Sequence, residues 1–187
     1  MSRPLDDVVV FDLTRLFCTS LTAAFLADFG ARVIRLEIEP GAARAESGWN
    51  HDADLIHRNK ESLALDASGE PGRALLHALL AKADAFVTDW SVAELAALGI
   101  DYAGACALRD DIVYGRLSGF GPVGPDRELP PIDELAAART GMMPIVPQPG
   151  QPPVYTGAGA MHASTMLAFG VVTALLHRAA SGEGQAV

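Results

Sequence analysis

Short runs of apolar residues, separated by polar turns, recur along this chain and predict alternating strands and helices. The run at residues 8–11 is flanked by aspartates, a pattern typical of a strand buried on both faces. A helix is predicted over residues 21–29, with Ser20 as its N-cap and Gly30 as its stop. A second strand follows over residues 32–36, so these three elements form one βαβ unit.

The same alternation continues through the middle of the chain. A helix is predicted over residues 71–83, where leucines recur on one face. Two more β-rich runs, at residues 85–88 and 112–117, enclose alanine-rich helical segments at residues 92–98 and 102–108. Strands that alternate with helices predict an α/β fold, with an open, doubly wound and mainly parallel sheet and flanking helices.

The last third of the chain has a different pattern. A loop rich in glycine and proline covers residues 119–131, a helix follows through Arg139, and residues 144–153 are irregular and dense in proline. Residues 161–180 are apolar nearly all round, which predicts a helix buried beneath other protein. The glycine-rich turn after it should lead into another strand at residues 185–187. We therefore expect the chain to be part of a longer protein.

The composition and net charge of the chain limit the kinds of molecule that it is expected to bind. The chain has 14 Lys and Arg against 23 Asp and Glu, a net charge of -9, which offers no basic field to nucleic acid or to an anionic membrane. Its two cysteines, Cys18 and Cys106, lie far apart, so neither a disulfide framework nor a zinc site is indicated and a cytoplasmic location fits best. No apolar run reaches the ~20 residues of a membrane span, and the histidines show no metal-ligand spacing. We expect no membrane association and no metal.

Seven pieces of sequence, in order, resemble one enzyme family. They are PLDDVVVFDLTR (4–15), LADFGARVIRLE (26–37), RNKESLALD (58–66), GRALLHALLAKADAFV (72–87), LGIDY (98–102), SGFGPVGP (118–125) and GEGQ (182–185). On these pieces the chain resembles the N-terminal part of the family III CoA-transferases, the CaiB/BaiF group that includes formyl-CoA transferase and α-methylacyl-CoA racemase. The resemblance implies a Rossmann-like large-domain segment over residues 1–187. It also implies a smaller domain and a returning C-terminal segment outside this chain, and two chains interlocked as a homodimer or heterodimer.

The resemblance also implies a chemistry in which a carboxylate attacks an acyl-CoA thioester, so that the acyl group passes through an anhydride to a small carboxylic acid. The family's aspartate precedes the last long helix, and counting back from GEGQ places Ala160 there. Alanine cannot form an anhydride. His162 is a candidate base or nucleophile, although a histidine near a helix start is more often a polar cap. Two alternatives follow: an acyl-CoA enzyme with altered chemistry or a nucleophile from another chain, and a non-catalytic chain that pairs with an active paralogue.

The racemase branch of the family moves an α-proton between a histidine and an aspartate. The resemblance places Ile132 and Ala160 at those two positions, so this route is not expected. Asp133 is retained beside Ile132. A carboxylate that follows two prolines is well placed to cap a helix, and we interpret Asp133 as such a cap.

A CoA site needs cations for the phosphates, an apolar slot for adenine, and backbone groups along the pantetheine arm. By resemblance, the ribose and pantetheine contacts follow the first strand, and an aromatic residue follows the fourth. By the same resemblance, Ile38, Ser91 and Ala97 stand where family members have basic phosphate partners, and Asp89, which replaces an asparagine, would repel a phosphate. The candidate ligands of CoA or acyl-CoA in this chain are Arg15, Phe17, Cys18, Arg44, Arg58, Lys60 and Trp90.

Overall fold

A six-stranded parallel sheet forms the centre of the computed structural model, with the strand order β3-β2-β1-β4-β5-β6. The structure describes residues 2–38, 55–127, 129, 132–145, 147, 149–155 and 157–187. The strands are β1 (Val9–Leu13), β2 (Arg32–Glu37), β3 (Lys60–Ala64), β4 (Ala85–Thr88), β5 (Val113–Arg116) and β6 (Gln185–Ala186).

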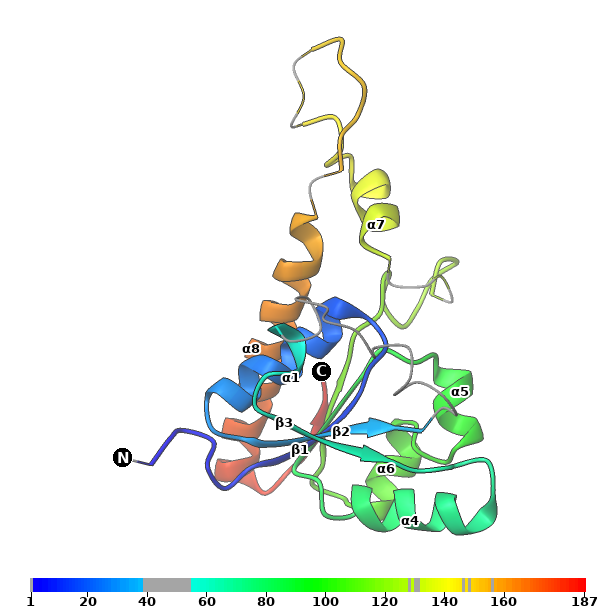
Figure 1. Ribbon diagram of the computed structural model, residues 1–187, viewed down its shortest axis with the longest axis vertical. Helices are drawn as coiled ribbons and strands as arrows, with labels where there is room; N and C mark the ends of the chain where they lie inside the picture. Colours follow the sequence, from blue (N-terminus) through cyan, green and yellow to red (C-terminus); the bar gives the residue numbers. More distant parts are fainter. Residues whose placement is uncertain are drawn as a thin grey trace.

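Helices cover both faces of this sheet (Figure 1). One face packs against α4 (Glu70–Leu80), α5 (Val92–Ala97) and α6 (Tyr102–Leu108). The other face packs against α1 (Phe17–Asp28) and α8 (Ala158–Ser181). The helix α7 (Asp133–Thr140) lies beyond the sheet, in the part of the molecule drawn uppermost in Figure 1.

Alternate residues of the central strands β1, β2, β4 and β5 enter two separate cores, because successive side chains of a strand point to opposite faces. In β4, Phe86 joins the core beneath α4, α5 and α6, whereas Val87 joins the core beneath α1 and α8. Neither side chain is exposed to solvent. Burial on both faces explains why these strands read as continuous apolar runs. The prediction of a doubly wound α/β fold is confirmed.

The order of the strands reverses between β1 and β4. The chain runs outward from β1 through β2 to β3, and then crosses back to place β4 on the other side of β1. In open α/β sheets, ligands bind in the crevice outside the carboxyl ends of the strands at such a reversal. The topology therefore points to the residues that follow β1 and β4.

The first helix begins earlier than the sequence predicted. It starts at Phe17 with Leu16 as its N-cap, so the predicted N-cap, Ser20, is wrong. Ser20 lies one turn inside α1, where its side chain is buried and accepts a hydrogen bond from Lys60. The start of the helix is instead stabilised by Asp89, whose carboxylate accepts the backbone N–H of Leu16 at 2.8 Å.

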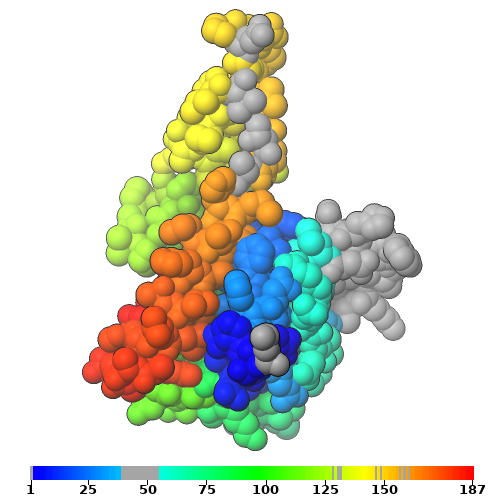
Figure 2. Space-filling model, turned by 90° about the vertical axis from the view of Figure 1, so that its left-hand side faces the viewer, coloured from blue at the N-terminus to red at the C-terminus, as the bar shows by residue number. Residues whose placement is uncertain are grey.

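The long helix α8 is buried on one side only. Val171 is fully buried, and Gly115 of β5 lets the helix approach, because a Cβ at that position would lie 2.9 Å from Val171 Cγ2. Along the outer side Met166, Phe169 and Leu176 are 65, 66 and 72% exposed. Figure 2 shows α8 in orange along the surface beside α1. Its length and composition alone would suit a membrane span, but it forms part of the helical layer over the sheet.

Candidate functional site

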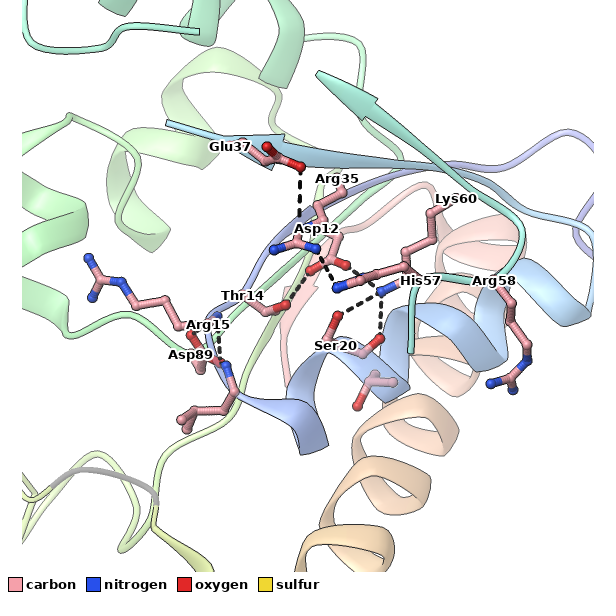
Figure 3. A network of polar contacts seen from close by, with 12 residues as sticks. Asp12, Thr14, Arg15, Ser20, Arg35, Glu37, His57, Arg58, Lys60 and Asp89 are labelled. Atoms are coloured by element: carbon pink, nitrogen blue, oxygen red, sulfur yellow. Dashed lines mark hydrogen bonds and ion pairs between the residues drawn. The ribbon is translucent and has the colours of Figure 1, made fainter. Parts of the chain in front are cut away.

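A buried ion pair connects two strands at the core of the sheet. Lys60 Nζ of β3 lies 2.6 Å from Asp12 Oδ2 of β1, and the two side chains are 1% and 0% exposed. Lys60 also donates to the carbonyl oxygen of Ser20 at 2.7 Å and to its hydroxyl at 2.9 Å, while the Thr14 hydroxyl donates to Asp12 at 2.7 Å (Figure 3). Burial lowers the pKa of Lys60, and the Asp12 carboxylate acts in the opposite direction. Lys60 thus joins β3, β1 and α1 from inside the protein.

Arg58 and Asn59 of the same motif join the start of β3 to the end of α1. Arg58 Nε lies 3.1 Å from the Asp28 carboxylate, and Asn59 Nδ2 donates to it at 2.9 Å. Asn59 has a left-handed backbone, with a φ of 60°, a conformation that asparagine tolerates better than most residues. Figure 3 shows Arg58 directed away from Lys60 and Asp12. The two predicted phosphate ligands of this motif therefore point to different places, and each already has an acidic partner.

Asp89 fixes the backbone between β1 and α1. Its carboxylate accepts the backbone N–H groups of Arg15, at 3.0 and 3.1 Å, and of Leu16, at 2.8 Å. Burial raises the pKa of Asp89, and these hydrogen bonds oppose that effect. A carboxylate at a helix N-terminus occupies the place where anions are favoured. The protein itself therefore supplies the anion at the start of α1.

Arg15 stacks on an aromatic ring next to this turn. Its guanidinium carbon lies 3.6 Å from the centre of the Trp90 ring, and Nη1 lies 2.8 Å from Glu94 Oε1. Glu94 also forms a capping box with Ser91 at the start of α5. Hydrogen bonds from Ser91 and Arg15 lower the pKa of Glu94 to about 2. The Arg15 guanidinium, held by Glu94, therefore covers the indole ring of the buried Trp90.

The lowered pKa of Glu94 makes stability depend on pH. The folded pKa of about 2 lies below the ordinary 4.5, so the carboxylate contributes stability above pH 4.5 that is lost as the pH falls towards 2. We expect the Glu94→Gln variant to lose less free energy of unfolding than the unaltered protein across that range. Urea unfolding of both proteins at several pH values tests this, and parallel curves would contradict it.

A cavity of about 520 Å³ opens at the carboxyl ends of β1, β4 and β5, where the strand order reverses. We call it the switch-point cavity. Of the candidate ligands predicted from the sequence, Arg15 lines it and Trp90 lies beneath Arg15. The lining residues are Arg15, Leu16, Asp89, Ser91, Val92, Glu94, Arg116, Leu117, Ser118, Pro122, Arg127 and Leu129.

The remaining predicted ligands lie elsewhere. Phe17 is half-buried at the first position of α1. Cys18 is buried, its carbonyl oxygen accepts the Ser164 hydroxyl at 2.6 Å, and burial raises the pKa of its thiol. Arg44 lies outside the described residues. Neither Phe17 nor Cys18 lines the switch-point cavity.

Two arginines of the cavity, Arg116 and Arg127, were missed by the sequence analysis. Arg116 ends a strand that is otherwise buried, and a charged residue at the carboxyl end of a parallel strand is a signal that could have identified it. Arg127 lies in the loop between β5 and α7 and carried no comparable signal.

Asp133 lies against the first turn of α8. It is the first residue of α7 rather than its cap, since the N-cap is Ile132, so that interpretation is wrong. Its carboxylate instead accepts the Tyr155 hydroxyl at 2.8 Å, which raises the pKa of Tyr155 to about 12. A Cβ at Gly159 would lie 2.1 Å from Asp133 Oδ1, so a larger residue there would require the Asp133 side chain to move. The Asp133 carboxylate therefore lies beside Gly159, which directly precedes Ala160 in the sequence.

The position that the resemblance assigns to the nucleophile, residue 160, lies in the first turn of α8. His162 is exposed on the same helix and does not line the switch-point cavity. Within the described ranges, no group of three His, Cys, Asp or Glu side chains could hold a metal ion.

Two curated proteins that this chain resembles are CoA-transferases by name. The chain is 32% identical over 99% of its length to succinyl-CoA–D-citramalate CoA-transferase of Chloroflexus aurantiacus, and 32% identical over 96% to cinnamoyl-CoA:phenyllactate CoA-transferase of Clostridium sporogenes. These alignments cover 48 and 47% of the two relatives. The chain thus spans about half the length of the curated relatives it matches.

Solved structures agree with the sequence matches. A CaiB/BaiF family protein from Brucella suis superposes with a TM-score of 0.92 at 26% identity, over 100% of this chain and 53% of that one. The family model of CoA-transferase family III matches residues 5–187. This confirms the resemblance seen in the sequence motifs, and the chain belongs to CoA-transferase family III.

Proposed function

We propose that this chain handles acyl-CoA thioesters in the transfer of CoA between carboxylic acids, and that the thioester binds in the switch-point cavity. The observation that carries the proposal is the position of this cavity at the reversal of strand order in a member of CoA-transferase family III. Both relatives described above are named as CoA-transferases that act on CoA thioesters of organic acids.

The volume and lining of the cavity support its role as a small-molecule site. Its volume of about 520 Å³ lies within the range of small-molecule sites, which is about 300–1,000 Å³. The Arg15 guanidinium, stacked on Trp90, offers a flat cationic surface to an adenine ring or a phosphate. Asp89 holds the backbone of Arg15 and Leu16, so the wall is fixed before the ligand arrives.

We infer further that residue 160 supplies no nucleophile. An anhydride with the acyl group requires a carboxylate, and alanine has none. A second candidate function follows from this residue: a non-catalytic chain that pairs, as homodimer or heterodimer, with an active paralogue. An acyl-CoA enzyme with altered chemistry transfers CoA without another chain. If the nucleophile comes from another chain, or if this chain is a non-catalytic partner of an active paralogue, transfer is seen only after that other chain is added.

A charge placed at the mouth of the cavity tests where CoA binds. Pro122 and Pro125 are exposed prolines of the same loop, but only Pro122 lines the cavity. We expect Pro122→Glu to weaken CoA binding about tenfold by repelling the phosphates, as measured by calorimetric titration. Pro125→Glu makes the same change in net charge and should leave affinity unchanged. Equal affinities for both variants would place the CoA site elsewhere.

A further inference from the structure

Arg116 brings a positive charge to the wall of the switch-point cavity. It is the last residue of β5, it is paired in register with Thr88 of β4, and its backbone N–H donates to the carbonyl oxygen of Val187 at 3.0 Å. Strand β4 on one side and the residue that follows β6 on the other therefore fix its backbone. Two residues earlier on the same face of the strand, Tyr114 is buried in the core. Arg116 thus continues the core face of β5 to the point where the sheet ends and the cavity begins.

The other charged groups of the cavity already have partners inside the protein. Arg15 pairs with Glu94 at 2.8 Å, and Asp89 accepts backbone N–H groups at the start of α1. Arg127 is the third arginine of the lining, and it is not without a partner either. The lining therefore holds two carboxylates that are both engaged by groups other than Arg116.

Arg116 differs from these groups. In the part of the chain that the structure describes, its half-buried side chain forms no ion pair with an acidic residue. Removing a guanidinium from water without a counter-charge is unfavourable, and an anion that enters the cavity would restore the balance. A planar guanidinium can donate two parallel hydrogen bonds to a phosphate or a carboxylate.

We propose that Arg116 is the anion-binding residue of the switch-point cavity and that it holds phosphate or carboxylate oxygens of the ligand. The identity of that ligand rests on the proposed function, since a CoA thioester carries phosphates and an acceptor acid carries a carboxylate. The residue acts by binding, and no bond is made or broken at the guanidinium.

Three probes identify the group that Arg116 holds: CoA, inorganic pyrophosphate and succinate. Equilibrium binding is measured for the unaltered protein, for Arg116→Gln and for Arg116→Lys. Arg73→Gln is the matched control, because Arg73 is exposed on α4 and does not line the cavity. We expect Arg116→Gln to weaken anion binding by about tenfold to a hundredfold, Arg116→Lys to retain part of the affinity, and Arg73→Gln to retain all of it. Loss of CoA and pyrophosphate binding identifies a phosphate, whereas loss of succinate binding identifies a carboxylate.

The outcomes separate this proposal from the proposed function. If CoA binds the unaltered protein, and Arg116→Gln binds all three probes as tightly as Arg73→Gln does, this proposal is overturned and the proposed function stands. If pyrophosphate or succinate binds through Arg116 but CoA does not bind, the proposed function fails and this proposal stands. Absence of binding by all three probes overturns both. Circular dichroism and thermal unfolding of each variant establish that affinity is compared between folded proteins.

Discussion

Replacing Ala160 with aspartate is expected to raise the rate of CoA transfer from succinyl-CoA to a carboxylic acid by about 10³-fold or more. The new carboxylate can attack the thioester carbonyl, form an anhydride and release CoA as the thiolate. The thiolate then attacks the aspartyl carbonyl of the anhydride and frees the donor acid. The acceptor carboxylate and CoA repeat the two steps in reverse, which restores the aspartate. Chromatography of the CoA esters measures the rate.

The fold should tolerate this change. Residue 160 is the third residue of α8, and an acidic side chain in the first turn of a helix is favoured by the helix dipole, by about 0.3–1 kcal/mol. Ala160→Asn is the matched control, since its amide has the same shape but forms no anhydride, and we expect it to remain inactive. Equal activity of the aspartate and asparagine variants would show that a carboxylate at residue 160 is not the nucleophile.

The second large effect is on stability. Replacing Lys60 with methionine is expected to lower the free energy of unfolding by about 3–5 kcal/mol, because it leaves the Asp12 carboxylate buried without its counter-charge. Such a loss is a large part of the total stability of a typical domain, which is about 5–15 kcal/mol. Urea unfolding measures the difference directly.

Two comparisons show whether the ion pair is the cause. The double variant with Asp12→Asn and Lys60→Met should lose less than the sum of the two single variants, because neither charge is then left alone. Arg32→Met breaks the Arg32–Glu61 pair, whose side chains are 61 and 55% exposed, and should cost much less stability than Lys60→Met does. If Lys60→Met were as stable as Arg32→Met, the buried pair would have no such role.

Much of the fold could be predicted from the apolar runs, because strands that are covered on both faces leave a continuous apolar signal. The edge strand β3 was not recognised as a strand, since its side chains are mostly exposed or half-buried and its sequence mixes charged and apolar residues. The start of α1 was misplaced because its stabilising group, Asp89, lies 73 residues from Leu16 in the sequence. Local capping patterns cannot reveal a partner at that separation.

The candidate site was harder to predict because the role of a charged residue depends on its partners. Arg58 and Lys60 were interpreted as phosphate ligands, but folding brings Asp28 and Asp12 against them. Arg116 was not predicted as a ligand, although among the residues that the structure describes folding places no acidic partner against it. Its place in the switch-point cavity follows from the strand order, which sets β5 beside β4, and no local pattern encodes that neighbour.

Mass spectrometry of the protein after incubation with succinyl-CoA tests most directly the claim that this chain has kept the fold of its family but lost the nucleophile. The unaltered protein should carry no covalent acyl or CoA adduct, whereas Ala160→Asp should carry one on the peptide that contains residue 160. An adduct on the unaltered protein would contradict the account, because it would show that another side chain performs the attack.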